Sequence, residues 1–104
     1  PHLIFIPTAI SLTMPSKTVG DTMEETRDRH RRYLRAINNP ARRGILRSIK
    51  DGNNELSSIS ADTGIDEKTV GWHIRVLMDG YCVEEEGATY TLTQEGLVVD
   101  YLDK

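Results

Sequence analysis

The sequence predicts a mainly α-helical domain with one small β-hairpin, an α+β arrangement in which helices dominate. Several capped segments carry apolar residues at spacings of three and four, the repeat of a helix that packs on one face. Two short segments alternate apolar and polar residues about a glycine, which predicts two strands joined by a tight turn. A length of 104 residues suits one domain with a modest core. The expected order is helix, helix, two helices joined by a turn, hairpin, helix.

Residues 1–20 are expected to form an apolar N-terminal arm, and residues 21–104 the folded domain. The arm is β-prone and is interrupted by Pro7. One interpretation is an ordered segment that packs on this subunit or on a partner. The other is a leader that precedes a true start at Met14 or Met23.

The first helix is expected over residues 21–38, where two capping boxes are possible, Asp21 with Glu24 or Thr22 with Glu25. Its apolar stripe consists of Met23, Thr26, His30, Tyr33, Leu34 and Ile37.

The second helix is expected over residues 40–50. Asn39 is its predicted cap, and Pro40 suits the first helical position, where a missing N–H is tolerated. The side chains expected to be buried are Ala41, Ile45, Leu46 and Ile49.

Residues 54–80 predict two short helices joined by a tight turn. Asn54 is expected to cap the first of them, in which Leu56 and Ile59 face inward. Gly64 is expected to end it, because glycine adopts a positive φ at little cost.

The second of these helices is expected over residues 67–79, with Asp66 as its cap and Gly80 as its end. The inward stripe consists of Val70, Ile74, Leu77 and Met78, and the outer face of Glu67, Lys68, Gly71, Trp72 and Arg75. A capped helix, a glycine turn and a second helix with a polar outer face form the helix-turn-helix pattern.

The end of the chain predicts a hairpin and a last helix. Residues 81–85 and 89–93 alternate about Glu86-Gly87, as in two antiparallel strands. Thr93 can cap the last helix, whose apolar stripe consists of Leu97, Val98, Tyr101 and Leu102.

Charge is distributed unevenly along the chain, although the formal net charge is only −3. Residues 27–47 contain eight arginines and one acid, whereas residues 50–104 contain four basic residues and twelve acids. The basic residues are therefore concentrated in one block, and the tertiary structure determines which surface of the protein carries them.

Several function classes find no support in the sequence. The lone Cys82 cannot form an intrachain disulfide, and no apolar run reaches the length of a membrane span, so the cytoplasm is the expected location. The three histidines and one cysteine lack the spacing of a metal site, so neither a metal nor a cofactor is expected. No nucleophile–base pair or phosphate loop is present, and an enzyme is not expected.

A hairpin directly after the second helix of a helix-turn-helix makes a winged helix. The motifs that carry a closer resemblance are Asn39-Pro40-Ala41-Arg42-Arg43-Gly44-Ile45-Leu46, Glu55-Leu56 with Ile59, Thr69-Val70-Gly71-Trp72-His73-Ile74-Arg75-Val76-Leu77, Gly80-Tyr81-Cys82-Val83 and Tyr90-Thr91-Leu92-Thr93. On these motifs, residues 39–93 resemble the DNA-binding core of ArsR-type bacterial and archaeal regulators.

The resemblance implies a homodimer held by the first and last helices, with two recognition helices on a pseudo-palindromic DNA site. The residues expected at the dimer interface are Met23, His30, Tyr33, Leu34, Ile37, Leu97, Val98, Tyr101 and Leu102. Two-fold symmetry of the protein would match that of the operator.

The residues expected to contact DNA lie mainly on the outer face of the recognition helix, 67–79. Lys68 and Arg75 can reach bases or phosphates, and Thr69 can donate to a phosphate. Gly71 would allow close approach to the groove. Trp72 is open to three interpretations: it covers the base of the hairpin, contacts a thymine methyl or sugar, or docks a protein. Arg42 and Arg43, at the start of the second helix, are candidate phosphate ligands.

Two departures from the family pattern qualify the resemblance. Metal sensors of the family often carry a cysteine pair where this chain has Ser57 and Ser58, so metal sensing by that route is not expected. The predicted wing carries Glu84, Glu85 and Glu86, which phosphates would repel.

The leading hypothesis is therefore a sequence-specific, homodimeric DNA-binding transcriptional regulator that senses no metal. The alternative is a winged helix that binds a protein instead of DNA, with Trp72 and the acidic wing as its docking surface.

Overall fold

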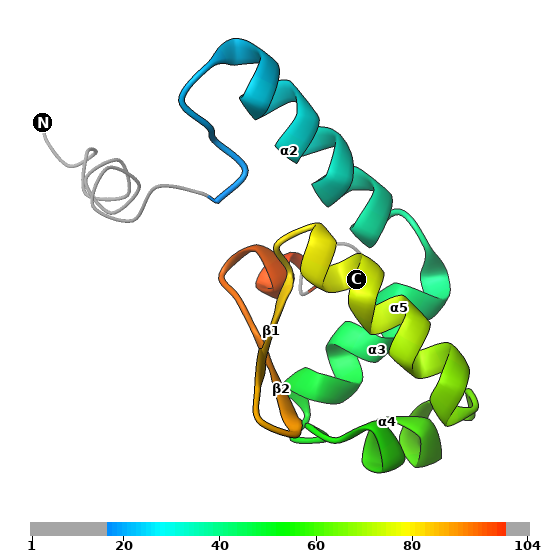
Figure 1. Cartoon of the computed structure of the whole chain (residues 1–104). Coiled ribbons are helices and arrows are strands. Elements are labelled where there is room, and N and C mark those ends of the chain that lie inside the picture. Colours follow the sequence, from blue (N-terminus) through cyan, green and yellow to red (C-terminus); the bar gives the residue numbers. More distant parts are fainter. Residues whose placement is uncertain (1–16, 100–104) are drawn as a thin grey trace, which may run out of the picture.

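The computed structural model describes residues 17–99 of the chain as four helices followed by a two-stranded antiparallel hairpin and a short 3-10 helix (Figure 1). This confirms the predicted winged helix-turn-helix. The elements are α2 (Met23–Ile37), α3 (Pro40–Lys50), α4 (Leu56–Thr63), α5 (Glu67–Asp79), β1 (Val83–Glu86), β2 (Thr89–Leu92) and η1 (Glu95–Val98). Most of the expected arm, and Tyr101 and Leu102 of the expected last helix, lie outside the described residues. No helix among the described residues is long and apolar enough to cross a membrane.

Helices α2 and α3 begin as the sequence predicts. The hydroxyl of Thr22 accepts from the backbone N–H of Glu25 at 3.1 Å, so Thr22 rather than Asp21 is the N-cap of α2. The box is not reciprocal, because the carboxylate of Glu25 accepts from the backbone N–H of Asp21 at 2.7 Å. Asn39 caps α3, because its Oδ1 accepts from the backbone N–H of both Ala41 and Arg42. Local side-chain chemistry thus sets both starting points.

The predicted cap of α4 is wrong by one residue. Glu55, not Asn54, is the N-cap, and it forms a reciprocal capping box with Ser58. The carbonyl of Asn54 accepts instead from the backbone N–H of Tyr90 at 2.9 Å, which ties Asn54 to strand β2. The helix therefore starts one residue later. Its end is as predicted, since Gly64 has a φ of +78°.

The predicted turn of the hairpin is also displaced by one residue. Val83 pairs with Leu92 and Glu86 pairs with Thr89, so the turn is Gly87-Ala88 rather than Glu86-Gly87. Gly87 adopts a φ of +62°. This register places Val83, which is 3 % exposed, opposite the partly buried Leu92 at the core end of the hairpin.

The last predicted helix begins as the 3-10 helix η1. Its N-cap is Gln94 rather than the predicted Thr93, although the hydroxyl of Thr93 accepts from the backbone N–H of Gly96 at 3.1 Å. The predicted apolar stripe is only partly correct. Val99 is buried although the stripe did not include it, whereas Leu97 is 43 % exposed.

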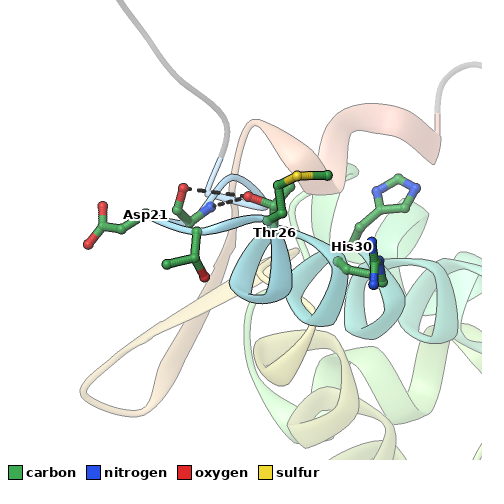
Figure 2. A pocket seen from close by; sticks show the side chains of 7 residues that line it. Asp21, Thr26 and His30 are labelled. Carbon is green, nitrogen blue, oxygen red and sulfur yellow. Dashed lines mark hydrogen bonds between the residues drawn. The ribbon is translucent and has the colours of Figure 1, made fainter.

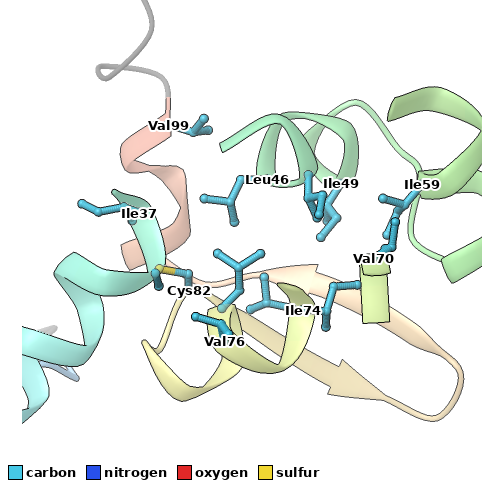
Figure 3. Packing of buried hydrophobic residues seen from close by; sticks show 13 residues of the cluster. Ile37, Leu46, Ile49, Ile59, Val70, Ile74, Val76, Cys82 and Val99 are labelled. Atoms are coloured by element: carbon cyan, nitrogen blue, oxygen red, sulfur yellow. The ribbon is translucent and has the colours of Figure 1, made fainter. Parts of the chain in front are cut away.

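The core lies between the helices and the hairpin (Figure 3). Most of its fully buried side chains come from α3, α4, α5 and the segment that leads into β1, and they include Ile45, Leu46, Ile59, Val70, Ile74, Leu77 and Cys82. Helix α2 reaches this core with its C-terminal half, through the buried Ala36 and Ile37 and the partly buried Tyr33. Its N-terminal half extends away from α3, α4 and α5 (Figure 1).

Helices α2 and α5 approach each other closely at Gly80, the residue that ends α5. A Cβ atom at this position would lie 2.5 Å from Cβ of Ala36 and 2.7 Å from the carbonyl oxygen of Arg32. Only glycine fits there. Since its φ is −94°, the requirement is space rather than a left-handed turn.

Candidate nucleic-acid interface

The start of α5 is fixed by Asp66. Its carboxylate accepts from the backbone N–H of Thr69 at 3.1 Å and from the Thr69 hydroxyl at 2.7 Å. Both hydrogen bonds lower the pKa of the Asp66 carboxyl, and the one from the Thr69 hydroxyl has the larger effect. The Thr69 hydroxyl, a predicted phosphate donor, thus already donates within the protein and serves the cap.

The outer face of α5 carries the other predicted contact residues together. Lys68 and Arg75 are exposed, and Trp72 between them is 52 % exposed. Gly71 lies on the same face, and a Cβ atom added there would meet nothing within 4 Å. These residues line a shallow hollow of about 350 Å³ together with Leu56 and Glu67. Leu56 was predicted only as a core residue, and no local signal indicates that the start of α4 borders this face.

Trp72 is half-exposed on the outer face of α5. Its indole ring lies beside two groups on its inner side. The guanidinium carbon of Arg42 is 5.9 Å from the ring centroid, and the ring of His73 is 5.1 Å away at an interplanar angle of 64°. These neighbours hold the indole while half of its surface faces solvent.

Arg42 is buried rather than presented to solvent, with 7 % of its surface exposed. Its Nε donates to the carbonyl oxygen of Ala36 at 3.0 Å, and its Nη2 donates to that of Arg35 at 2.9 Å. Burial, and secondarily the charge of Arg35, lowers the pKa of Arg42. The expectation that Arg42 offers its guanidinium to a phosphate does not fit this geometry, because the group already holds the end of α2.

Arg43 acts at the same end of α2. Its Nη1 donates to the carbonyl oxygen of Ile37 at 2.9 Å. The carbonyl of Leu34 accepts from the backbone N–H of Asn38. Arg42 donates to the two carbonyls between these, so each of the last four carbonyls of α2 accepts a hydrogen bond. The last four carbonyls of a helix have no donor within the helix itself. The two arginines therefore join α3 to the end of α2.

His73 is partly buried and hydrogen-bonded. Its Nδ1 lies 3.3 Å from Nη1 of Arg42. A guanidinium can only donate, so Nδ1 is the acceptor and we infer that the proton of the neutral ring is on Nε2. Burial, followed by the charge of Arg42, lowers the pKa of His73. Arg42 thereby links the end of α2 to α5.

The hairpin presents acids. Glu84, Glu85 and Glu86 of β1 are all exposed. At its base, Nζ of Lys17 donates to Glu84 at 2.5 Å, and the backbone N–H of Lys17 donates to Glu95 at 2.8 Å. The segment before α2 is thus tied to the hairpin, and the remaining carboxylates of β1 face solvent.

The residues expected at a dimer interface fall into three groups. Met23, Leu34 and Leu97 are exposed by 78 %, 45 % and 43 %, respectively, and His30 is exposed as well. Ile37 is buried in the core of its own chain, and Tyr33 and Val98 are partly buried against that core. Tyr101 and Leu102 lie outside the described residues.

A hollow of about 510 Å³ lies at the N-terminal end of α2 (Figure 2). The hydroxyl of Thr26 accepts from the backbone N–H of Gly20 at 2.9 Å. This hydrogen bond holds the segment before α2, which forms one side of the hollow, against the helix. The lining residues are Gly20, Asp21, Thr22, Met23, Thr26, Arg27 and His30.

No group of three or more histidine, cysteine, aspartate or glutamate side chains that could hold a metal occurs within residues 17–99. Cys82 is buried, and burial raises the pKa of its thiol to about 12. The thiol therefore stays protonated at neutral pH and is chemically inert.

Residues 39–80 match the model of a family described as bacterial regulatory protein, arsR family. The match begins at the cap of α3, includes α4 and α5, and ends at Gly80. A search of curated proteins finds no relative that matches the sequence at a significant level. The family match confirms the resemblance that the motifs of this stretch predict.

Proposed function

We propose that this ArsR-like helix-turn-helix chain, a DNA-binding transcriptional regulator, works as a homodimer that places α5 of each subunit in the major groove. The observation that carries the proposal is the outer face of α5, where Lys68, Trp72 and Arg75 project beside Gly71. Two cationic side chains flank an apolar one on a helix that the helix-turn-helix leaves exposed, which is the composition of a recognition surface.

Lys68 and Arg75 have different proposed roles. Lys68 is in the first turn of α5, the end that enters the groove in this motif, and can reach a base edge or a phosphate. Arg75 is about two turns further along, where it can reach the DNA backbone or a guanine. Arg42 and Arg43 support this surface from behind by fixing α2 against α3.

Exposed apolar side chains support the proposed dimer. Met23 and Leu34 leave large apolar surfaces in solvent along a helix whose N-terminal half lies apart from the domain. Leu97 adds a third such surface on η1. A second copy that packs these side chains would bury them, and its symmetry would double the recognition helices.

The acidic hairpin is proposed to stay off the DNA. Glu85 and Glu86 would face phosphates if β1 entered a neighbouring groove, and that repulsion would weaken binding. We also propose that regulation does not use a metal, since Ser57 and Ser58 stand where metal sensors of this type carry cysteines. Because the proposed target is chromosomal DNA, the proposed location is the cytoplasm.

The test is fluorescence anisotropy of the full chain with the DNA upstream of its own coding sequence and with a scrambled duplex, at two salt concentrations. We expect tighter binding to the upstream DNA, weakened by salt with a log–log slope of about −0.9 for each neutralised phosphate. Lys68→Ala and Arg75→Ala should each weaken binding. Arg31→Ala is the matched control, because it removes one positive charge from an exposed site on α2.

The outcomes separate the two hypotheses for the outer face of α5. Equal affinity for both duplexes, with no effect of the Lys68 and Arg75 variants, would reject sequence-specific binding through α5 and favour the protein-docking alternative. If Zn²⁺ or a chelator changes the affinity for DNA, the proposal that the protein senses no metal is rejected. The dimer is tested by sedimentation equilibrium of the wild type against Leu34→Glu, which should shift the chain toward monomer.

A further inference from the structure

The outer face of α5 contains one feature that phosphate contacts do not explain. Trp72 is the only tryptophan of the chain, and it exposes half of its surface at the centre of the face that the proposed function assigns to DNA. Lys68 precedes it by four residues and Arg75 follows it by three, so all three share one side of the helix. The apolar ring thus lies between the two cations.

The indole ring is held in place before any ligand binds. The guanidinium of Arg42 lies over it at 5.9 Å, and the ring of His73 packs against it at 5.1 Å. Arg42 is itself anchored by its bonds to the carbonyls of Arg35 and Ala36. A side chain that is already ordered loses little conformational entropy on binding, so its apolar contact can contribute to affinity.

Space is left for a partner directly beside the ring. Gly71 has no side chain, and a Cβ atom there would meet nothing within 4 Å. The hollow of about 350 Å³ is bordered by Lys68, Gly71, Trp72 and Arg75. The backbone of α5 can therefore come close to a base edge while the indole lies alongside it.

The chemistry of the major groove identifies the matching group. Base edges in that groove are hydrogen-bond donors and acceptors, with the 5-methyl group of thymine as the apolar exception. The exposed part of an indole is mostly hydrocarbon, with a single N–H donor. A methyl group packed against the ring would leave water together with the indole surface that it covers.

We propose that Trp72 is a specificity-determining residue that recognises thymine through its 5-methyl group in each half of the operator. This inference rests on the proposed function, because it requires α5 to enter the major groove. Lys68 and Arg75 supply contacts on either side, and Trp72 selects T·A pairs at the centre of the half-site.

The probe is a duplex that the wild-type chain enriches from a library of random sequences. Each thymine is replaced in turn by deoxyuridine, which removes only the methyl group and keeps every hydrogen-bonding group. Affinity is measured by anisotropy for the wild type, Trp72→Ala, Trp72→Phe and Lys68→Ala. Since the ring of Trp72 is half exposed, these variants are expected to fold, and circular dichroism checks that they do.

We expect deoxyuridine at one or two positions of each half-site to weaken wild-type binding by about fourfold, the effect of one buried methyl group. Trp72→Ala should bind the thymine and deoxyuridine duplexes equally at those positions, and Trp72→Phe should keep part of the difference. Lys68→Ala should bind both duplexes more weakly while keeping the ratio between them.

Two results would overturn the inference in distinguishable ways. If the wild type binds the enriched duplex but no deoxyuridine matters, or if the difference survives in Trp72→Ala, Trp72 does not recognise thymine and the proposed function stands. If the library yields no enriched duplex, sequence-specific DNA binding and the role of Trp72 both fail.

Discussion

Replacing Arg42 by methionine would separate its structural role from the phosphate contact that its position in the sequence suggests. The substitution keeps an apolar chain of similar reach and removes the guanidinium. In the structure that group is 7 % exposed and donates to the carbonyls of Ala36 and Arg35 at 3.0 and 2.9 Å. Arg42→Met would leave both acceptors without this donor at the end of α2.

The expected loss of stability follows from these two hydrogen bonds. A hydrogen bond to a charged group contributes about 1.5–3 kcal/mol, so the pair sets an upper bound of about 3–6 kcal/mol. Burial of the charge, which also lowers the pKa of Arg42, opposes this gain. Arg35 lies on the exposed side of α2, where water can replace the donor. We therefore expect the free energy of unfolding to fall by about 2–3 kcal/mol.

The assay is urea unfolding followed by far-UV circular dichroism, at one fixed protein concentration because a dimer gains stability from association. Arg27→Met is the matched control, since it makes the same chemical change at an exposed position of α2 and should alter stability by no more than about 0.5 kcal/mol. A difference between the two variants of less than about 1 kcal/mol would refute the structural role of Arg42.

Two further predictions concern α5. Gly71→Ala and Gly44→Ala each add a methyl group where nothing lies within 4 Å, so each should stabilise its helix by up to about 1 kcal/mol in urea unfolding, but only Gly71→Ala should weaken DNA binding. Equal DNA affinity of both variants would contradict close approach of α5. The second prediction concerns pH. Since the folded pKa of His73 is lowered, the unfolded chain binds more protons just below about pH 6.5, and stability should fall as pH decreases through this range toward the folded pKa. His73→Gln should show a flatter dependence in unfolding measured near neutral pH and at about pH 5.5, and an unchanged slope would reject the assignment.

The sequence by itself determined the helices and most of their ends. Thr22, Asn39, Asp66 and Gly64 act within three or four residues of their own positions, through a side-chain oxygen or a permitted positive φ. Such local chemistry can be read without knowing what lies nearby in space. The outer face of α5 followed from the same reasoning, because helical periodicity separates its buried and exposed residues.

The tertiary structure decided what periodicity could not. Asn54 has the chemistry of a cap, but a hydrogen bond from Tyr90, far away in the sequence, fixes it to a strand. Arg42 belongs to a block of basic residues and was predicted to contact phosphates. In the structure α2 and α3 pack closely, and the guanidinium is buried where it donates to the carbonyls of Ala36 and Arg35. Each outcome depends on which groups remain without partners when separate elements meet, and only the packed chain determines that.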